Sequence, residues 1–174
     1  SMLLDLPGGN GDGDLLKSFD AGLRFNMVPR EATAVVEVTD NEDLVTRFTA
    51  FLDENPVTGS IEVEPDGAHI EVIGKAAHGM EPEKGINAAT YLATFLKQLQ
   101  LGGNAQDFVA YVADYLHLDT RMDKFNAAFS DPVMGEMTMN AGLLSFDQQT
   151  GAHIDMNFRY PKGITPDEIK AAVA

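Results

Sequence analysis

The chain has 174 residues, a formal net charge of −15 at pH 7 and no cysteine. This length is enough to bury a substantial core. The excess of acidic residues disfavours nucleic acid and anionic membranes as partners, and the lack of cysteine excludes disulfides and thiolate metal ligands. No apolar run is long enough to span a membrane, and no secretory pattern opens the sequence. We therefore expect a cytoplasmic protein.

Hydrophobic periodicity and turn signals predict the elements in chain order. Residues 1–14, rich in Gly and Asp, are expected to be a loop within a flexible N-terminal segment or fragment boundary at 1–16, and 17–174 to form one domain. The predicted elements are strands at 19–29 and 32–39, a helix at 41–54 capped by Asp40, a hairpin at 60–74 around Pro-Asp-Gly, a helix at 84–100, two helical patterns within 104–129, a hairpin at 136–161 and a helix from Thr165.

This order predicts an α+β fold, in which helices cover one face of an antiparallel sheet. Residues 32–100 supply the first five elements of a ferredoxin-like β-α-β-β-α-β sandwich, and one strand of the later hairpin could supply the sixth. The helical patterns at 104–129 are interpreted as an insertion. The last helix begins with a capping box, Thr165 to Glu168, yet the sequence stops at Ala174. We therefore expect a piece of a longer protein.

Three polar residues stand at the ends of apolar strands: Asn26 in RFNMVP, His78 in GKAAHGM and Arg159 in MNFRYP. An amide can hydrogen-bond a ligand, an imidazole can donate to a developing oxyanion, and a guanidinium can bind a carboxylate with two parallel bonds. Together they would suit a short peptide with a free C-terminus. Each also has an ordinary structural interpretation, as a turn residue, an idle loop histidine or a surface ion-pair partner.

A metal site within the chain is not predicted. The four histidines are scattered, and no H-x-x-x-H spacing occurs. His117-Leu118-Asp119 is an H-x-D tripeptide, but the stretch reads as helical, which would point the two side chains apart. A polar helix flank is the better interpretation.

The segment GKAAHGMEPEKGINA at 74–88 resembles a motif of the two-zinc aminoacylase/carboxypeptidase family of metallopeptidases, G-x-x-A-H-x-x-x-P-x-x-G-x-N-A. NMVP at 26–29, MNAG at 139–142 and FRYP at 158–161 resemble flanking motifs of the same family. The resemblance covers the chain from about residue 17 and is strongest to the PepV-like bacterial dipeptidase branch, whose small domain is enlarged.

The resemblance implies that this chain is the lid of such an enzyme. The two zinc ions and the glutamate base would belong to a catalytic domain of the same polypeptide, so that the fragment alone binds no metal and is inactive. By the same resemblance, His78 would stabilise the oxyanion, Arg159 would bind the substrate carboxylate and Asn26 would hydrogen-bond the dipeptide.

Two other hypotheses remain open at this stage. A free-standing ferredoxin-like module would bind small ligands or pair with itself through a sheet edge. A complete enzyme using His117 and Asp119 would bind zinc tightly by itself.

Overall fold

The computed structural model describes residues 2–6, 14–24, 26–120, 123–125, 130–131, 135–136, 138–159 and 165–173, with the side chains of 2–6, 130–131, 135–136 and 159 excepted. The strands are β1 (Met2–Leu6), β2 (Leu15–Ala21), β3 (Glu31–Glu37), β4 (Thr58–Glu64), β5 (Gly67–Ile73), β6 (Ser130–Asp131), β7 (Gly135–Glu136), β8 (Thr138–Asp147) and β9 (Gly151–Arg159). The helices are α1 (Asn41–Glu54), α2 (Ala88–Leu96), α3 (Gly103–Tyr111) and α4 (Pro166–Val173), with short helical turns η1 (Pro82–Lys84), η2 (Val112–Leu116) and η3 (Asp123–Phe125).

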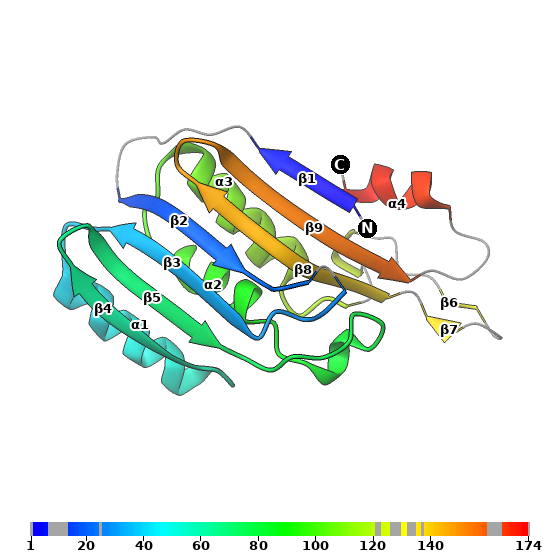
Figure 1. Ribbon diagram of the computed structural model, residues 1–174, viewed down its shortest axis with the longest axis horizontal. Helices are drawn as coiled ribbons and strands as arrows, with labels where there is room; N and C mark the ends of the chain where they lie inside the picture. Colours follow the sequence, from blue (N-terminus) through cyan, green and yellow to red (C-terminus); the bar gives the residue numbers. More distant parts are fainter. Residues whose placement is uncertain are drawn as a thin grey trace.

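Seven strands form one antiparallel sheet in the order β1-β9-β8-β2-β3-β5-β4. Helices α1, α2 and α3 lie on one face of this sheet (Figure 1). The predicted α+β, ferredoxin-like class is therefore confirmed. The order β3-α1-β4-β5-α2 is the ferredoxin-like run, but β2 and not the later hairpin lies beside β3 as its remaining strand.

The core fills the layer between the sheet and the helices. Strand β3 shows the alternation that produces it, since Ala32, Ala34 and Val36 are buried while the residues between them are more exposed. Aromatic rings connect the helix layer to the sheet. Phe108 of α3 packs edge-on against Phe19 of β2, with ring centroids 5.3 Å apart, and stacks on Phe146 of β8 at 5.6 Å. These contacts give the chain one continuous core.

Several predicted elements are confirmed at their predicted places. Helix α1 begins after Asp40, whose carboxylate accepts a hydrogen bond from the Asp43 N–H at 3.0 Å. The β4–β5 hairpin turns at Pro-Asp-Gly as predicted, and the β8–β9 hairpin lies within the predicted range 136–161. Helix α4 follows Thr165, whose hydroxyl accepts a hydrogen bond from the Glu168 N–H.

Other predictions are wrong in part. Residues 2–6 form a strand paired with β9 and not a loop. The strand predicted at 19–29 is β2, which ends at Ala21 because Gly22 adopts φ +90° next to the main chain of Gly142. The helix predicted at 84–100 is the shorter α2, which Asn87 caps. Within 104–129, α3 is followed by the π-helical turn η2 and by η3, and residues 126–129 lie outside the described part.

Within the described residues, no helix has both the length and the apolar character needed to cross a membrane.

Candidate functional site

His78 lies on a loop whose two ends are tied together. Lys75 and Ile86 pair as an isolated antiparallel bridge, and each N–H donates to the other's carbonyl at 2.9 Å. One residue earlier, the Gly74 N–H donates to the Arg30 carbonyl at 2.8 Å, where β5 lies beside β3. The loop 75–86 is therefore anchored at its base to the sheet.

A second bridge fixes the middle of this loop against the segment that carries Asn26. Met27 and His78 are antiparallel partners, flanked by hydrogen bonds from the Val28 N–H to the Ala77 carbonyl at 2.8 Å and from the Gly79 N–H to the Asn26 carbonyl at 2.6 Å. The structure thus brings the predicted residues Asn26 and His78 together, although 52 positions separate them in the sequence.

Gly79 is required at this junction. A Cβ atom added to it would lie 2.8 Å from the Asn26 carbonyl oxygen and 2.9 Å from the Asn157 side-chain nitrogen. These distances are well inside van der Waals contact, so only glycine allows the two main chains to approach this closely.

The imidazole of His78 is exposed, and its Nδ1 accepts a hydrogen bond from the Met80 N–H at 3.0 Å. Because a main-chain N–H can only donate, Nδ1 is the unprotonated nitrogen in the neutral ring, and Nε2 carries the proton. The loop therefore selects the tautomer in which Nε2 is a hydrogen-bond donor. Nearby, the hydrogen bond and charge of Lys84 lower the pKa of Glu81, and His78 contributes less.

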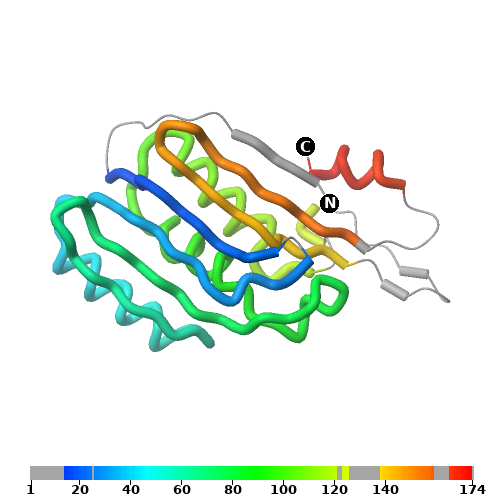
Figure 2. Tube along the Cα trace, viewed as in Figure 1, coloured from blue at the N-terminus to red at the C-terminus, as the bar shows by residue number. Residues whose placement is uncertain are grey.

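Arg159, the third predicted residue, is the last residue of β9 and pairs with Thr138 at the start of β8. Its side chain lies outside the described part of the chain. Asn157, two positions earlier in the strand, contacts Gly79 as described above. The end of β9 therefore lies beside the His78 loop, and Figure 2 shows the green 75–86 segment and the start of β8 at the same end of the sheet.

Two buried or half-buried asparagines at this end were not predicted from the sequence. Asn87 caps α2, accepting from the Ala89 and Thr90 N–H groups, and its Nδ2 donates to the Ala141 carbonyl at 3.1 Å. Asn140 is 3% exposed, and its Nδ2 donates to the Met27 carbonyl at 2.9 Å. Both lie in motifs quoted above, GINA and MNAG, but only the fold shows which main chains they join.

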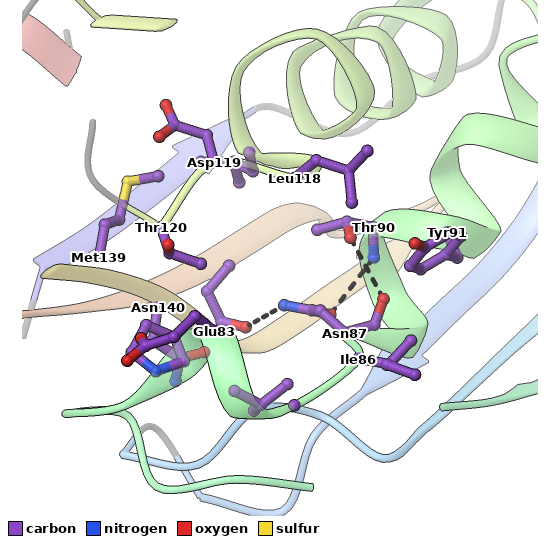
Figure 3. Close-up of a pocket in the computed structure, with 15 residues that line it drawn as sticks. Glu83, Ile86, Asn87, Thr90, Tyr91, Leu118, Asp119, Thr120, Met139 and Asn140 are labelled. Carbon is purple, nitrogen blue, oxygen red and sulfur yellow. Dashed lines mark hydrogen bonds between the residues drawn. The ribbon is translucent and has the colours of Figure 1, made fainter. Parts of the chain in front are cut away.

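A cavity of about 230 Å³ lies between the start of α2, the turn at Pro82–Gly85, the loop after η2 and the start of β8. Figure 3 shows Asn87 and Thr90 on one side of it and Asp119, Thr120 and Asn140 on others. Its described lining contains two acidic side chains, Glu83 and Asp119, and no basic one, so the cavity is unsuited to an anion. Neither Asn26 nor His78 is among these lining residues.

His117 and Asp119 lie after a helical turn and contact different partners. The prediction of a helix through them is wrong, because the helical turn ends at Leu116 and Leu118 has φ +58°. The Nδ1 atom of His117 lies 3.1 Å from the Thr90 hydroxyl, and burial, aided by the charge of Lys124, lowers the histidine pKa to about 4.

The Asp119 carboxylate accepts hydrogen bonds from the main-chain N–H groups of Asp123 and Lys124. Among the described residues, no group of three or more His, Cys, Asp or Glu side chains is placed to hold a metal ion.

Comparison with known proteins identifies the family. The model of the peptidase dimerisation domain matches residues 66–174. A Staphylococcus saprophyticus protein named "putative dipeptidase" is 40% identical over 154 residues, which is 88% of this chain and 33% of that protein. A Staphylococcus haemolyticus protein, also named "putative dipeptidase", is 38% identical over 84% of this chain. A Staphylococcus aureus strain USA300 protein with the same description is 40% identical over 85% of this chain, and each match covers 32% of the relative. The chain belongs to the peptidase dimerisation domain family and spans about a third of the length of these relatives.

Proposed function

We propose that the chain is the lid of a zinc-dependent dipeptidase and supplies substrate-binding groups to a catalytic domain in the rest of a longer polypeptide. The supporting observation concerns His78. Its imidazole is exposed, its loop is held by two pairs of main-chain hydrogen bonds, and its Nδ1 accepts a hydrogen bond from the Met80 N–H. The ring is thereby prepared to donate from Nε2. The relatives support the same proposal, because proteins named as dipeptidases contain this domain as about a third of their length.

In this proposal His78 donates a hydrogen bond to the scissile carbonyl oxygen as negative charge develops on it. A donor held in place before the reaction needs no reorganisation at the transition state, which is why such groups contribute strongly to catalysis. Arg159 binds the carboxylate of the dipeptide, and Asn26 hydrogen-bonds the bound substrate. Zinc would activate the attacking water; the described residues do not fit a zinc site, so the two ions are assigned to the catalytic domain.

The test is steady-state kinetics of the longer protein carrying His78→Ala. Loss of one preorganised oxyanion donor is expected to lower kcat by about 10²–10³-fold with a much smaller change in KM. His69→Ala is the matched control, since His69 is a second exposed histidine that hydrogen-bonds Asp66 beside the β4–β5 turn. Kinetics of His78→Ala equal to those of His69→Ala would refute the proposed role.

Arg159→Ala has a different expected signature. Removal of a carboxylate-binding group acts in the ground state as well as the transition state, so KM should rise for dipeptides and change little for substrates with an amidated C-terminus. An equal rise for both substrates would refute carboxylate binding by Arg159.

A further inference from the structure

Among the described residues, the first part of β8 has no strand partner on the side of β2. The two strands pair only from Leu144 to Asp147, because β2 ends at Ala21. The segment that carries Met27 approaches this part of β8, because the Asn140 Nδ2 donates to the Met27 carbonyl at 2.9 Å. One side-chain hydrogen bond therefore joins two main chains where the sheet ladder stops.

The direction of the Met27 carbonyl explains why this bond matters. The bonds that flank the Met27–His78 pair run from Val28 to Ala77 and from Gly79 to Asn26. In such a pair the N–H and C=O of the central residue point away from its partner. The Met27 carbonyl thus faces away from the His78 loop, and Asn140 is the group that donates to it.

Asn157 supports the same arrangement from the neighbouring strand. It is the antiparallel partner of Asn140, so the two side chains lie on one face of the sheet. Its amide nitrogen packs against Gly79, at 2.9 Å from where a Cβ would be. The two asparagines therefore contact both sides of the pair of segments, one at Met27 and the other at Gly79.

We propose that Asn140, supported by Asn157, is a positioning residue that sets the placement of His78 and Asn26. The assignment of a catalytic task to that placement rests on the function proposed above, whereas the positioning itself is a property of this chain. Asn140 binds no substrate in this proposal and acts through the main chain of Met27.

The positioning is tested by amide hydrogen exchange of the 174-residue chain followed by NMR. Asn140→Asp is nearly isosteric and keeps an acceptor oxygen but loses the donor. The Val28 and Gly79 amides, which bond across the two segments, are expected to exchange at least about tenfold faster than in the parent chain. Amides of the β3–β5 ladder should keep their relative protection.

Asn55→Asp is the matched control, because the Asn55 Nδ2 also donates to a main-chain carbonyl, that of Phe51 at 2.8 Å, at the end of α1. It should leave the Val28 and Gly79 amides unchanged. If the new charge prevents Asn140→Asp from folding, Asn140→Ala removes the same donor without it. Unchanged protection at both amides, or equal loss in the control, would overturn the inference.

A double-mutant cycle in the longer protein separates this inference from the proposed function. If Asn140 acts through His78, Asn140→Asp lowers kcat in the parent enzyme but has little further effect in the His78→Ala background. If His78→Ala leaves kcat unchanged, the proposed function is refuted. A large loss in His78→Ala with fully additive effects of Asn140→Asp would overturn the positioning inference alone.

Discussion

Asn87 carries two separable tasks, and substitution can measure each. Its Oδ1 accepts from the Ala89 and Thr90 N–H groups at the start of α2, and its Nδ2 donates to the Ala141 carbonyl of β8. Loss of a helix cap costs about 1 kcal/mol, and loss of a hydrogen bond to a main-chain carbonyl costs about another 1 kcal/mol. Asn87→Ala should therefore lower the free energy of unfolding by about 2 kcal/mol.

Two further variants divide that sum. Asn87→Asp keeps the acceptor that caps α2 and loses only the donor, so about 1 kcal/mol is expected. Asp40→Ala removes a cap that has a single function at the start of α1, so about 1 kcal/mol is expected there also. For a chain of this size, Asn87→Ala corresponds to a fall in Tm of about 4–8 °C.

The assay is urea unfolding of the four proteins at one pH, with the midpoint and the m-value fitted together. An unchanged m-value assigns the shift to the native state and not to the unfolded ensemble. If Asn87→Ala costs no more than Asp40→Ala, the bond to Ala141 contributes nothing and the reasoning about the link between α2 and β8 is wrong.

The remaining predictions concern Gly22 and His117. Gly22→Ala would place a Cβ 1.9 Å from the Gly142 carbonyl oxygen at a positive φ, so we expect a loss of at least about 2 kcal/mol in urea unfolding; a change below about 0.5 kcal/mol would show that this contact relaxes freely. His117 has a folded pKa of about 4 against 6.5 for a free side chain, so the unfolded chain binds more protons between these pH values. The stability it provides is complete above about pH 6.5 and falls on acidification toward pH 4, by about 1–3 kcal/mol. His117→Gln should remove this part of the pH dependence of the urea midpoint, and equal slopes in both proteins would contradict the assignment.

Local signals predicted the elements that depend on local chemistry. Helix α1 follows an aspartate cap and an apolar stripe, and the β4–β5 hairpin turns at Pro65–Asp66 as its sequence indicates. These features need only a few neighbouring residues, which is why the sequence alone was sufficient.

Features that depend on distant partners were not predictable in this way. The segment from Phe19 to Pro29 resembles one strand, but the approach of Gly142 to Gly22 ends β2 at Ala21, well before the proline. Strand β1 is short and depends on pairing with β9. Asn87 stands as a possible N-cap before the run AATYLATFL, but the apolar face read from Ile86 onward favoured an earlier helix start.

The candidate site shows the same division. His78 and Asn26 were selected because each stands at the end of an apolar strand, and their individual roles were implied only by the resemblance. The roles of Asn87 and Asn140 depend on bonds that span 54 and 113 positions of sequence. No local pattern distinguishes such asparagines from those of ordinary turns, so they could be assigned only after the fold was known.

The hydrogen bonds made by Asn87 and Asn140 explain why both residues are asparagines. Each side chain donates from Nδ2 to a main-chain carbonyl. An ionised aspartate can only accept hydrogen bonds, so it cannot replace either asparagine. Lysine or arginine could donate, but at a site as buried as Asn140 their charge would carry a large desolvation cost. A neutral amide meets both requirements. The asparagines of GINA and MNAG are therefore explained by the hydrogen bonds that hold the loop. The exposed His78 imidazole makes neither of these bonds, as the role proposed for it requires.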